Sequence, residues 1–546
     1  MNKNLGIMLD CSRNAVMTVE SVKKLILYLE KMDYKILQLY TEDTYEIPEE
    51  PLFGHFRGRY SQDEIREIDA FAKEHGIELQ PAIQTLAHVN QLFFWEKFEE
   101  IKDCADILLA ENPKTYDLID KMFKSLADCY TSKTVNIGMD EAHLLGAGKY
   151  FNNNGYKKRF DILMEHLNKV SEIAKKYSFK LLMWSDMFFR LVNKGDYYPP
   201  AGEKCPTVPK EIRDKLPDNV NLVYWDYYHD EQEVYDDMLD RHLDFGKEVW
   251  FAGGAWKWLG FYTGNLYSTP KIESSIKSCN EKGVNNVLIT LWGDDGNETS
   301  VFAVLPSLLY ASECAKGNYD IENTKRKFAQ LFGESYQDFL LCDLLRPDFE
   351  KRCRWGWSSG AKEFLYSDTF LGKFDSTVHG DEGEFFADME IKLKKAKKQS
   401  KNFSYIFEIY EKLCRVMKVK YTLGVRTRTA YKKGDKEELK LIVKDYEKSI
   451  RYIQDFIISF RNMWFTDNKP HGFDVQDLRL GGIIQRLKAN KQRLNDYING
   501  KVSKIDELDE ELVDILTGKD AKRITTCNNF LKIATPNSLA FNLFFH

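Results

Sequence analysis

The first 316 or so residues alternate short apolar runs with amphipathic stretches, a pattern typical of a parallel sheet wrapped by helices. Between the apolar runs lie helical patterns such as VESVKKLILYLEKM and QDEIREIDAFAKEHG. The runs predict strands at Leu5–Leu9, Ile36–Tyr40, Glu78–Ile83, Thr134–Met139, Lys180–Trp184, Asn221–Trp225, Glu248–Ala252 and Asn286–Leu291. About eight strand–helix units in this length predict a (β/α)₈ barrel with some enlarged loops.

From about residue 320 onward the chain has long helical runs and almost no strand signal. The runs are residues 389–418, 436–465 and 477–500. The fold class we expect is therefore α/β, a (β/α)₈ TIM barrel over residues 1–318 followed by an all-helical C-terminal domain over residues 319–546. The aromatic segment RCRWGWSSG, Arg352–Gly360, is expected to pack between the two domains.

Composition narrows the functional classes. The 546 residues exceed one ordinary domain, and 43% hydrophobic with 30% charged residues indicates a folded globular protein. A net charge of −6 creates no field that favours nucleic acid. The ten cysteines form no CxxC pair, and we find neither a signal peptide nor an apolar run near membrane-spanning length. We expect a cytoplasmic protein with reduced thiols, no cofactor or metal, and no nucleic-acid or membrane partner.

Active groups of such a barrel lie where strands end and the following loops begin. These positions are rich in carboxylates and indoles. They are Asp10, Arg13, Glu42, Asp43, His88, Asp140, Glu141, His143, Trp184, Asp186, Trp225, Asp226, Tyr227, Tyr228, Trp256, Trp258, Trp292, Asp294 and Asp295. Indole faces stack on sugar rings while carboxylates and arginine bind hydroxyls, so the set points to a carbohydrate; core packing is the alternative for any single tryptophan.

The sharpest local signal is TVNIGMDEAH, residues 134–143. Asp140 and Glu141 can both face a pocket only if the chain leaves the alternating pleat of the strand. Two carboxyls held together do not both ionise freely, so one protonated acid beside an ionised partner is expected, as glycosidic cleavage requires. The alternatives are two solvated acids in a surface loop, or Asp140 as a helix N-cap.

Several of these segments together resemble family 20 glycoside hydrolases, the β-N-acetylhexosaminidases. The opening run GIMLDCSRNAVMTVESVKKLILYLEKMDYKILQLYTED and the later GMDEAH, AHVNQL, LLMWSDMF, LVYWDYY and LWGDDG carry the resemblance, over roughly residues 5–300. Asn136 and Met139 replace the usual histidine and glycine around the acid pair, no mixed α/β domain precedes the barrel, and a helical region follows. This pattern is similar to the cytoplasmic, hexosaminidase D-like branch.

The resemblance implies an exo-acting retaining β-N-acetylhexosaminidase that removes terminal β-linked N-acetylglucosamine, N-acetylgalactosamine or both. The substrate's own acetamido oxygen would attack C1 and form an oxazolinium. Glu141 would be the acid and base, and Asp140 would orient the acetamido group. Tyr227 would bind the amide oxygen, with Tyr228 and Tyr262 as rivals. Arg13 and Asp294 would hold ring hydroxyls, and the walls would be Trp184, Trp225 and Trp292, with Trp256 a weaker candidate.

For His88, Arg13 and Asp226 the sequence leaves two interpretations open. His88 would relay through Glu42 or Asp43 toward Glu141, or would be an ordinary core histidine. Arg13 could instead form a structural ion pair, and Asp226 could bind sugar or fix its loop. We interpret His143 as a loop residue.

Two other functional classes fit parts of the pattern. A non-catalytic amino-sugar-binding barrel could keep Arg13 and the tryptophans, but the acid pair argues against it. A metal-dependent sugar isomerase would need three or four ligands on one ion, whereas indoles dominate these loops. The expected partner is a small glycan with a terminal N-acetylhexosamine. The sequence is compatible with a homodimer and leaves the linkage open.

Overall fold

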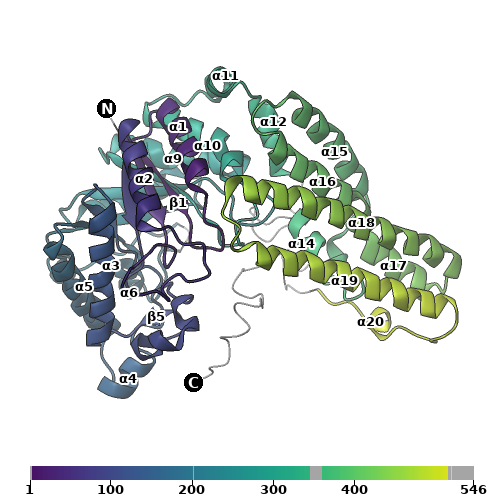
Figure 1. Cartoon of the computed structure of the whole chain (residues 1–546), viewed down its shortest axis with the longest axis horizontal. Helices are drawn as coiled ribbons and strands as arrows, with labels where there is room; N and C mark the ends of the chain where they lie inside the picture. Colours follow the sequence, from purple (N-terminus) through teal and green to yellow (C-terminus); the bar gives the residue numbers. More distant parts are fainter. Residues whose placement is uncertain (1–2, 201, 345–359, 515–517, 519–546) are drawn as a thin grey trace.

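Eight parallel strands close into a barrel in the N-terminal part of the chain (Figure 1). The computed structural model describes residues 3–200, 202–344, 360–514 and 518. In barrel order the strands are β1 (Asn4–Asp10), β10 (Asn286–Leu291), β9 (Val249–Gly254), β8 (Val220–Trp225), β7 (Lys180–Trp184), β6 (Thr134–Asn136), β3 (Glu78–Ala82) and β2 (Ile36–Tyr40). A small antiparallel pair, β4 (Lys102–Cys104) and β5 (Ile107–Leu108), lies in the loop after β3.

The barrel closes because β1 pairs with β10 on one side and with β2 on the other. Ile7 stands opposite Ile289 in β10 and opposite Leu37 in β2, and all three side chains are fully buried. Strands covered on both faces read as near-continuous apolar runs, which is why the sequence locates them well. The predicted bounds of β2, β7 and β10 match on both sides.

Helices alternate with the strands and cover the outside of the barrel (Figure 1). They are α1 (Val19–Lys31), α2 (Gln62–Glu74), α3 (Pro113–Cys129), α4 (Lys149–Asn154), α5 (Arg159–Lys176), α6 (Asp186–Val192), α7 (Lys210–Arg213), α8 (Gln232–Leu243), α9 (Asn265–Glu281) and α10 (Leu305–Ala315). Side-chain caps begin the first three of them, from Thr18, Ser61 and Asn112. Ser61 and Glu64 form a reciprocal capping box at α2, which satisfies backbone N–H groups that the first turn leaves free.

The rest of the described chain is helical, and the predicted fold class is confirmed there. The helices are α11 (Ile321–Phe332), α12 (Tyr336–Leu340), α14 (Gly360–Tyr366), α15 (Glu382–Gln399), α16 (Ser404–Lys420), α17 (Leu423–Lys432), α18 (Lys436–Asp467), α19 (Phe473–Ile498) and α20 (Asp506–Asp509). The two long helices α18 and α19 lie side by side, and their connection reaches the barrel (Figure 1). The predicted aromatic segment lies outside the described residues, apart from Gly360.

One predicted run, residues 389–418, is interrupted between α15 and α16. The Glu334 carboxylate accepts the backbone N–H groups of Lys401 and Asn402, both at 2.9 Å. A distant carboxylate therefore holds the chain in a turn where local periodicity alone predicts helix.

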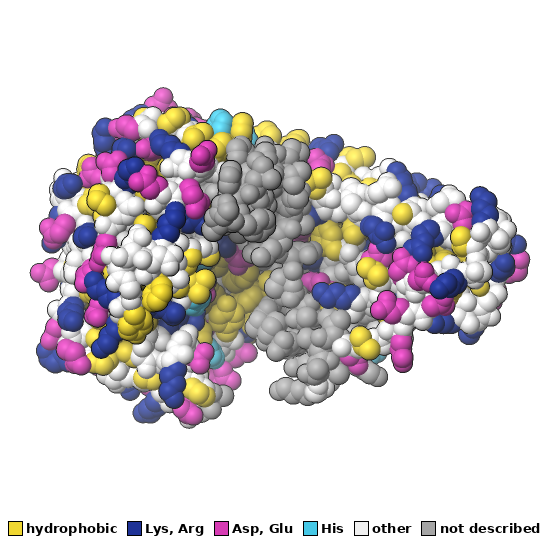
Figure 2. Space-filling view, turned by 90° about the horizontal axis from the view of Figure 1, so that it is seen from below, with side chains coloured by type: hydrophobic (Ala, Val, Ile, Leu, Met, Phe, Trp, Pro, Cys, Tyr) yellow, Lys and Arg dark blue, Asp and Glu magenta, His cyan; other side chains and the backbone are white. Residues whose placement is uncertain are grey.

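Charged side chains of both signs are interspersed over the face seen from below (Figure 2). Hydrophobic side chains gather on the barrel part of this face (Figure 2). Among the described helices, none combines the length and the apolar character that a membrane crossing requires.

Candidate active site

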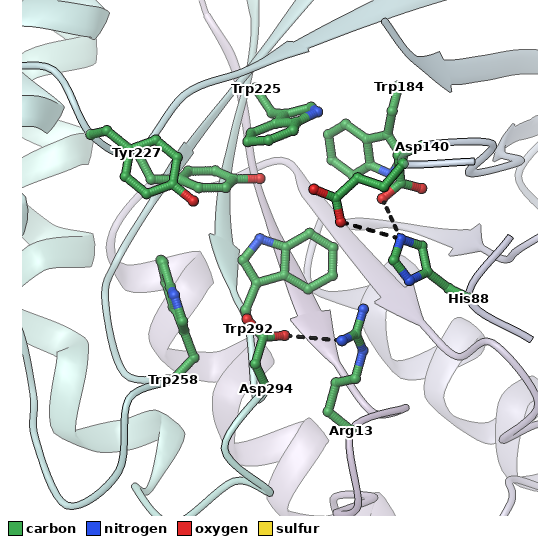
Figure 3. A pocket seen from close by; sticks show the side chains of 11 residues that line it. Arg13, His88, Asp140, Trp184, Trp225, Tyr227, Trp258, Trp292 and Asp294 are labelled. Carbon is green, nitrogen blue, oxygen red and sulfur yellow. Dashed lines mark ion pairs between the residues drawn. The ribbon is translucent and has the colours of Figure 1, made fainter. Parts of the chain in front are cut away.

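The carboxyl ends of the barrel strands surround one cavity of about 290 Å³ (Figure 3). Of the residues named first for catalysis and sugar binding, all but Trp256 line it; of the two expected to act as a relay, His88 lines it and Asp43 does not. The lining residues are Arg13, His88, Asp140, Glu141, Trp184, Trp225, Tyr227, Tyr228, Trp258, Trp292 and Asp294. Seven of the eight barrel strands contribute through their last residue or the loop that follows, so side chains far apart in sequence converge on one pocket of small-ligand size.

The acid pair lies just past a strand that is shorter than predicted. β6 ends at Asn136, not at Met139. The reason is a turn in which Gly138, Met139 and Glu141 have φ values of 71°, 66° and 50°. This left-handed backbone is unfavourable for residues with side chains and breaks the pleat. The break lets Asp140 and its neighbour Glu141 face the same cavity.

Gln84, after β3, holds this turn in place. Its Nε2 donates to Asp140 Oδ1 at 2.7 Å, and its Oε1 accepts the Met139 N–H at 3.1 Å. A Cβ atom on Gly138 would lie 2.0 Å from Gln84 Oε1, so close packing as well as positive φ requires glycine there. Sequence reasoning missed Gln84 because nothing local links it to the acid pair.

His88 lies against both acids. Its Nε2 is 3.2 Å from Asp140 Oδ2 and 3.7 Å from Glu141 Oε2 (Figure 3). Burial disfavours the imidazolium, but the Asp140 carboxylate outweighs it and raises the pKa of His88 to about 9. Burial likewise opposes ionisation of Asp140, yet His88 and Gln84 hold its pKa below the ordinary value. Asp140 is therefore the ionised partner of a charged histidine.

The two acids differ in exposure. The side chain of Asp140 is 12% exposed and that of Glu141 is 40% exposed. Glu141 is therefore the more solvent-accessible of the two acids, and Asp140 is the more buried. Arg190 Nη2 lies 3.6 Å from Glu141 Oε1.

Behind the pair lies a third carboxyl, Asp186, at the start of α6. Its Oδ2 accepts the backbone N–H of Glu141 at 3.1 Å and the Nε–H of Arg190 at 2.9 Å. Burial and the nearby Asp140 charge raise the pKa of Asp186 to about 7, against the pull of Arg190. The sequence identifies Asp186 only as a strand-end acid and does not indicate that Arg190 lies near the acid pair.

Arg13 and Asp294 face each other across the floor of the cavity. Arg13 Nη1 lies 3.2 Å from Asp294 Oδ1 (Figure 3). Arg13 Nε donates to Glu42 Oε1 at 3.1 Å. Burial raises the pKa of Asp294 to about 6 and that of Glu42 to about 7, although Arg13 opposes both shifts. The guanidinium is thus oriented by two carboxyls and still lines the pocket.

Asp43 does not take part in a relay toward Glu141, and that prediction needs correction. Its carboxylate pairs with Arg57 Nε at 3.3 Å and does not line the cavity. Glu42 has a φ of 39°, so the chain turns and sends the two neighbouring acids to different partners. Of the two, Glu42 is the one that acts electrostatically on His88.

Aromatic rings form the walls. Trp184, Trp225 and Trp292 line the cavity as predicted, with Trp292 between the acid side and the Tyr227 side in Figure 3. Trp225 stacks on Tyr227 with ring centroids 5.4 Å apart and planes 21° apart. Such faces suit the apolar face of a sugar ring.

Trp256 does not line the cavity, contrary to prediction, and Trp258 does. Trp256 is held away from it by its backbone bridge to Gly264 and by its Nε1–H, which donates to the Tyr227 carbonyl at 3.0 Å. Trp258 stacks on Trp256 with centroids 4.3 Å apart, so Trp256 supports the ring that faces the ligand space.

The structure distinguishes the three tyrosine candidates by whether they line the cavity. Tyr227 and Tyr228 both line the cavity, and Tyr262 does not. Asp226 fixes this loop: it accepts the Tyr228 N–H at 2.9 Å and lies 2.8 Å from His229 Nδ1, and it is not among the lining residues.

His88, Asp140 and Glu141 also offer one ligand atom each within 4.8 Å of one another, the geometry of a metal site. A cation here would have to displace the proton that the Asp140 carboxylate stabilises on His88. Arg190 close to Glu141 adds a second positive charge. The arrangement is an internally neutralised ion cluster.

Two family models match the chain. The catalytic domain of glycosyl hydrolase family 20 matches residues 5–235, and the glycoside hydrolase 20C C-terminal domain matches residues 338–527. The chain belongs to glycoside hydrolase family 20. The family 20 catalytic match contains the acid pair, His88 and the Trp225–Tyr228 segment, and the second match lies over the helical part.

Individual relatives are distant. A β-hexosaminidase of Emericella nidulans is 23% identical over 230 residues, which cover 35% of this chain and 37% of that protein. β-Hexosaminidase 1 of Coccidioides posadasii is 25% identical over 221 residues, 33% of this chain and 36% of that protein. The chain thus spans little more than a third of the length of these curated relatives. Among solved structures, a family 20 exo-β-N-acetylglucosaminidase of Vibrio harveyi aligns over 63% of this chain and 58% of its own, with 16% identity and a TM-score of 0.46.

Proposed function

We propose that this family 20 protein is an exo-acting retaining β-N-acetylhexosaminidase, which releases terminal β-linked N-acetylglucosamine, N-acetylgalactosamine or both. The observation that carries the proposal is the ion cluster of Asp140, His88 and Glu141 at the edge of an indole-lined cavity of about 290 Å³. The cavity is at the small end of ligand pockets, as a single terminal sugar requires.

Glu141 is the proposed general acid and then general base. Its side chain is the more exposed of the two acids, so it can protonate the glycosidic oxygen and later activate a water at the same place. The backbone bond to Asp186 holds its position. Arg190 and His88, both close to its carboxyl, stabilise the carboxylate that remains after proton transfer.

Asp140 is the proposed partner of the substrate's acetamido group. An ionised carboxylate beside Glu141 can accept the acetamido N–H and offset the positive charge that develops as the amide oxygen attacks C1. Both acids contact one imidazole and so lie on the same side of the cavity. A nucleophile opposite the leaving group is therefore better supplied by the substrate itself, which gives an oxazolinium intermediate and retention of configuration.

The remaining lining residues hold the sugar. Trp184, Trp225 and Trp292 would enclose the ring and the acetamido methyl group, and the Tyr227 hydroxyl would donate to the amide oxygen. Arg13 and Asp294 would bind the ring hydroxyls from the floor, since a guanidinium and a carboxylate side by side offer both donors and acceptors.

The test is hydrolysis of an aryl N-acetyl-β-glucosaminide and the matching galactosaminide by purified protein at pH 5 to 8. Turnover that requires the 2-acetamido group, is inhibited by a thiazoline mimic of the oxazolinium and gives the β-anomer first supports the proposal. A matched control is Glu172→Gln on the outer helix α5, which removes an exposed carboxylate and should leave the rate unchanged.

Three results would count against it. Binding of N-acetylglucosamine without turnover would favour the amino-sugar-binding barrel instead. Equal rates on 2-hydroxy glycosides would indicate a protein nucleophile, and first release of the α-anomer would indicate inversion.

A further inference from the structure

The loop that carries Asp294 is fastened to α19 of the helical part. Arg479 Nη1 donates to the Asp295 carbonyl at 2.6 Å and pairs with Glu298 Oε1 at 2.8 Å. Gln476 Nε2 donates to the Gly296 carbonyl at 3.1 Å. Backbone carbonyls directly after Asp294 thus accept hydrogen bonds from one helix outside the barrel.

The loop that carries Arg13 is hydrogen-bonded to the start of the same helix, α19. Asn14, with a φ of 91°, donates from Nδ2 to the Gly472 carbonyl at 2.8 Å and to the Gly296 carbonyl at 3.4 Å. A Cβ atom on Gly472 would lie 2.0 Å from the Asn14 carbonyl oxygen, so only glycine permits this approach. Met17 forms an antiparallel bridge with Asn468 in the turn between α18 and α19.

Buried charges make the contact between the Asp294 loop and α19 rigid. The Glu298 side chain is fully buried, and Lys362 Nζ lies 2.8 Å from its Oε2 while Arg479 holds its Oε1. Burial alone would raise the pKa of Glu298, but the two cations keep it below its ordinary value. A carboxylate held by two buried cations has little freedom to move.

Asp294 itself depends on this support. Its carboxylate pairs with Arg13, and the backbone on either side of it sets where the side chain begins. Lys257 Nζ reinforces that backbone, because it donates to the Trp292 carbonyl at 3.3 Å and to Asn297 Oδ1 at 2.6 Å. Both members of the Arg13–Asp294 pair therefore sit on loops whose geometry α19 controls.

We propose that Arg479 and Gln476 of α19 are positioning residues for the Arg13–Asp294 pair, so that the helical part sets how tightly the barrel holds the hydroxyls of the terminal sugar. This inference rests on the proposed function. It assigns to the helical part a role in substrate affinity that acts through the floor of the pocket.

The experiment is a double-mutant cycle on steady-state kinetics with an aryl N-acetyl-β-glucosaminide. Gln476→Met and Arg479→Met should each raise KM about tenfold and leave kcat within about twofold, because hydroxyl contacts to the ring are made in both ground and transition states. Asp294→Ala should raise KM about 30-fold, the range for a hydrogen bond to a charged group. The double variant Asp294→Ala with Arg479→Met should resemble Asp294→Ala alone.

A merely structural role gives a different result. Partial unfolding lowers the active fraction, and so lowers the apparent kcat at unchanged KM. Arg486→Met is the matched control: it removes another guanidinium from α19, whose ion pair with Asp368 lies within the helical part, and should keep the wild-type KM. Unchanged KM in both Gln476→Met and Arg479→Met, or losses that multiply in the double variant, would overturn the inference.

The wild-type protein separates this inference from the proposed function. If it binds N-acetylglucosamine without turnover, the proposed function fails and the same cycle is read from Kd by tryptophan fluorescence, since four tryptophans line the pocket. If it neither turns over nor binds the sugar, both proposals fall.

Discussion

The Asp186 carboxylate accepts the backbone N–H of Glu141 at 3.1 Å and thereby fixes the residue proposed as the acid. Asp186→Ala removes this acceptor and also frees Arg190, which then competes for the Glu141 carboxyl. We expect kcat to fall about 10- to 100-fold with little change in KM, because the loss affects proton transfer more than sugar binding. Steady-state kinetics with an aryl N-acetyl-β-glucosaminide measures this.

Asp240→Ala on α8, whose carboxylate pairs with Lys282 at the surface, is the matched control and should behave as wild type. An Asp186→Ala protein that keeps the wild-type kcat would show that the backbone bond does not position Glu141.

Glu141→Gln tests the acid role through the leaving group. An acid is needed most where the departing oxygen is basic, so activity on alkyl glycosides and oligosaccharides should fall about 10³-fold or more. Activity on aryl glycosides with acidic phenols should fall much less at the first step. Similar losses on both substrate types would contradict the assignment.

The His88–Asp140 pair makes stability depend on pH. The pKa of His88 is about 9 in the folded protein, above its unfolded value of about 6.5, so its contribution is complete below pH 6.5 and is lost as pH rises through 9. The shift corresponds to about 3 kcal/mol at most. The pKa of Asp140 is lowered, so its own contribution is lost at the acidic end instead.

His88→Gln should therefore cost more stability at pH 6 than at pH 9.5. Chemical denaturation of both proteins at the two pH values measures the difference, and His75→Gln, on the outside of the barrel beside Glu30, is the control. An equal cost at both pH values would mean that His88 is not charged in the folded protein.

The sequence predicts the barrel well because its strands are buried on both faces and therefore appear as continuous apolar runs. β2, β7 and β10 are located to the residue for this reason. It predicts less well where a backbone turn decides which way a side chain points. The positive φ of Glu42 separates it from Asp43, and the positive φ values around Met139 end β6 early. No local pattern announces such turns at residues other than glycine.

Contacts between residues far apart in the sequence are the second feature that the sequence alone does not predict. Gln84 reaches the acid pair from the loop after β3 and Arg190 from α6, and Arg479 reaches the Asp294 loop from α19. Pairings of this kind depend on the assembled barrel and not on spacing along the chain, so one sequence does not reveal them.

Substitution of Trp258 should affect KM more than substitution of Trp256. Trp258 faces the cavity, so Trp258→Ala should raise KM about tenfold through the loss of ring stacking. Trp256→Phe keeps an aromatic support behind Trp258 and should change KM less than twofold. A larger KM effect from Trp256→Phe than from Trp258→Ala would restore Trp256 as the wall residue.

Tyr227 is the proposed donor to the acetamido oxygen and Tyr228 is its rival, and the proposal selects the more buried of the two. Tyr227 is 6% exposed and stacked on Trp225, whereas Tyr228 is 37% exposed at the mouth. A hydroxyl that stabilises the attacking amide must be fixed before reaction, since a mobile donor would have to be ordered in the transition state. Tyr227→Phe should lower kcat about 10- to 100-fold and weaken thiazoline inhibition in proportion, while Tyr228→Phe should alter mainly KM. The reverse ranking, measured on one aryl substrate and one thiazoline, would move the assignment to Tyr228 and place the acetamido group closer to the open side of the pocket.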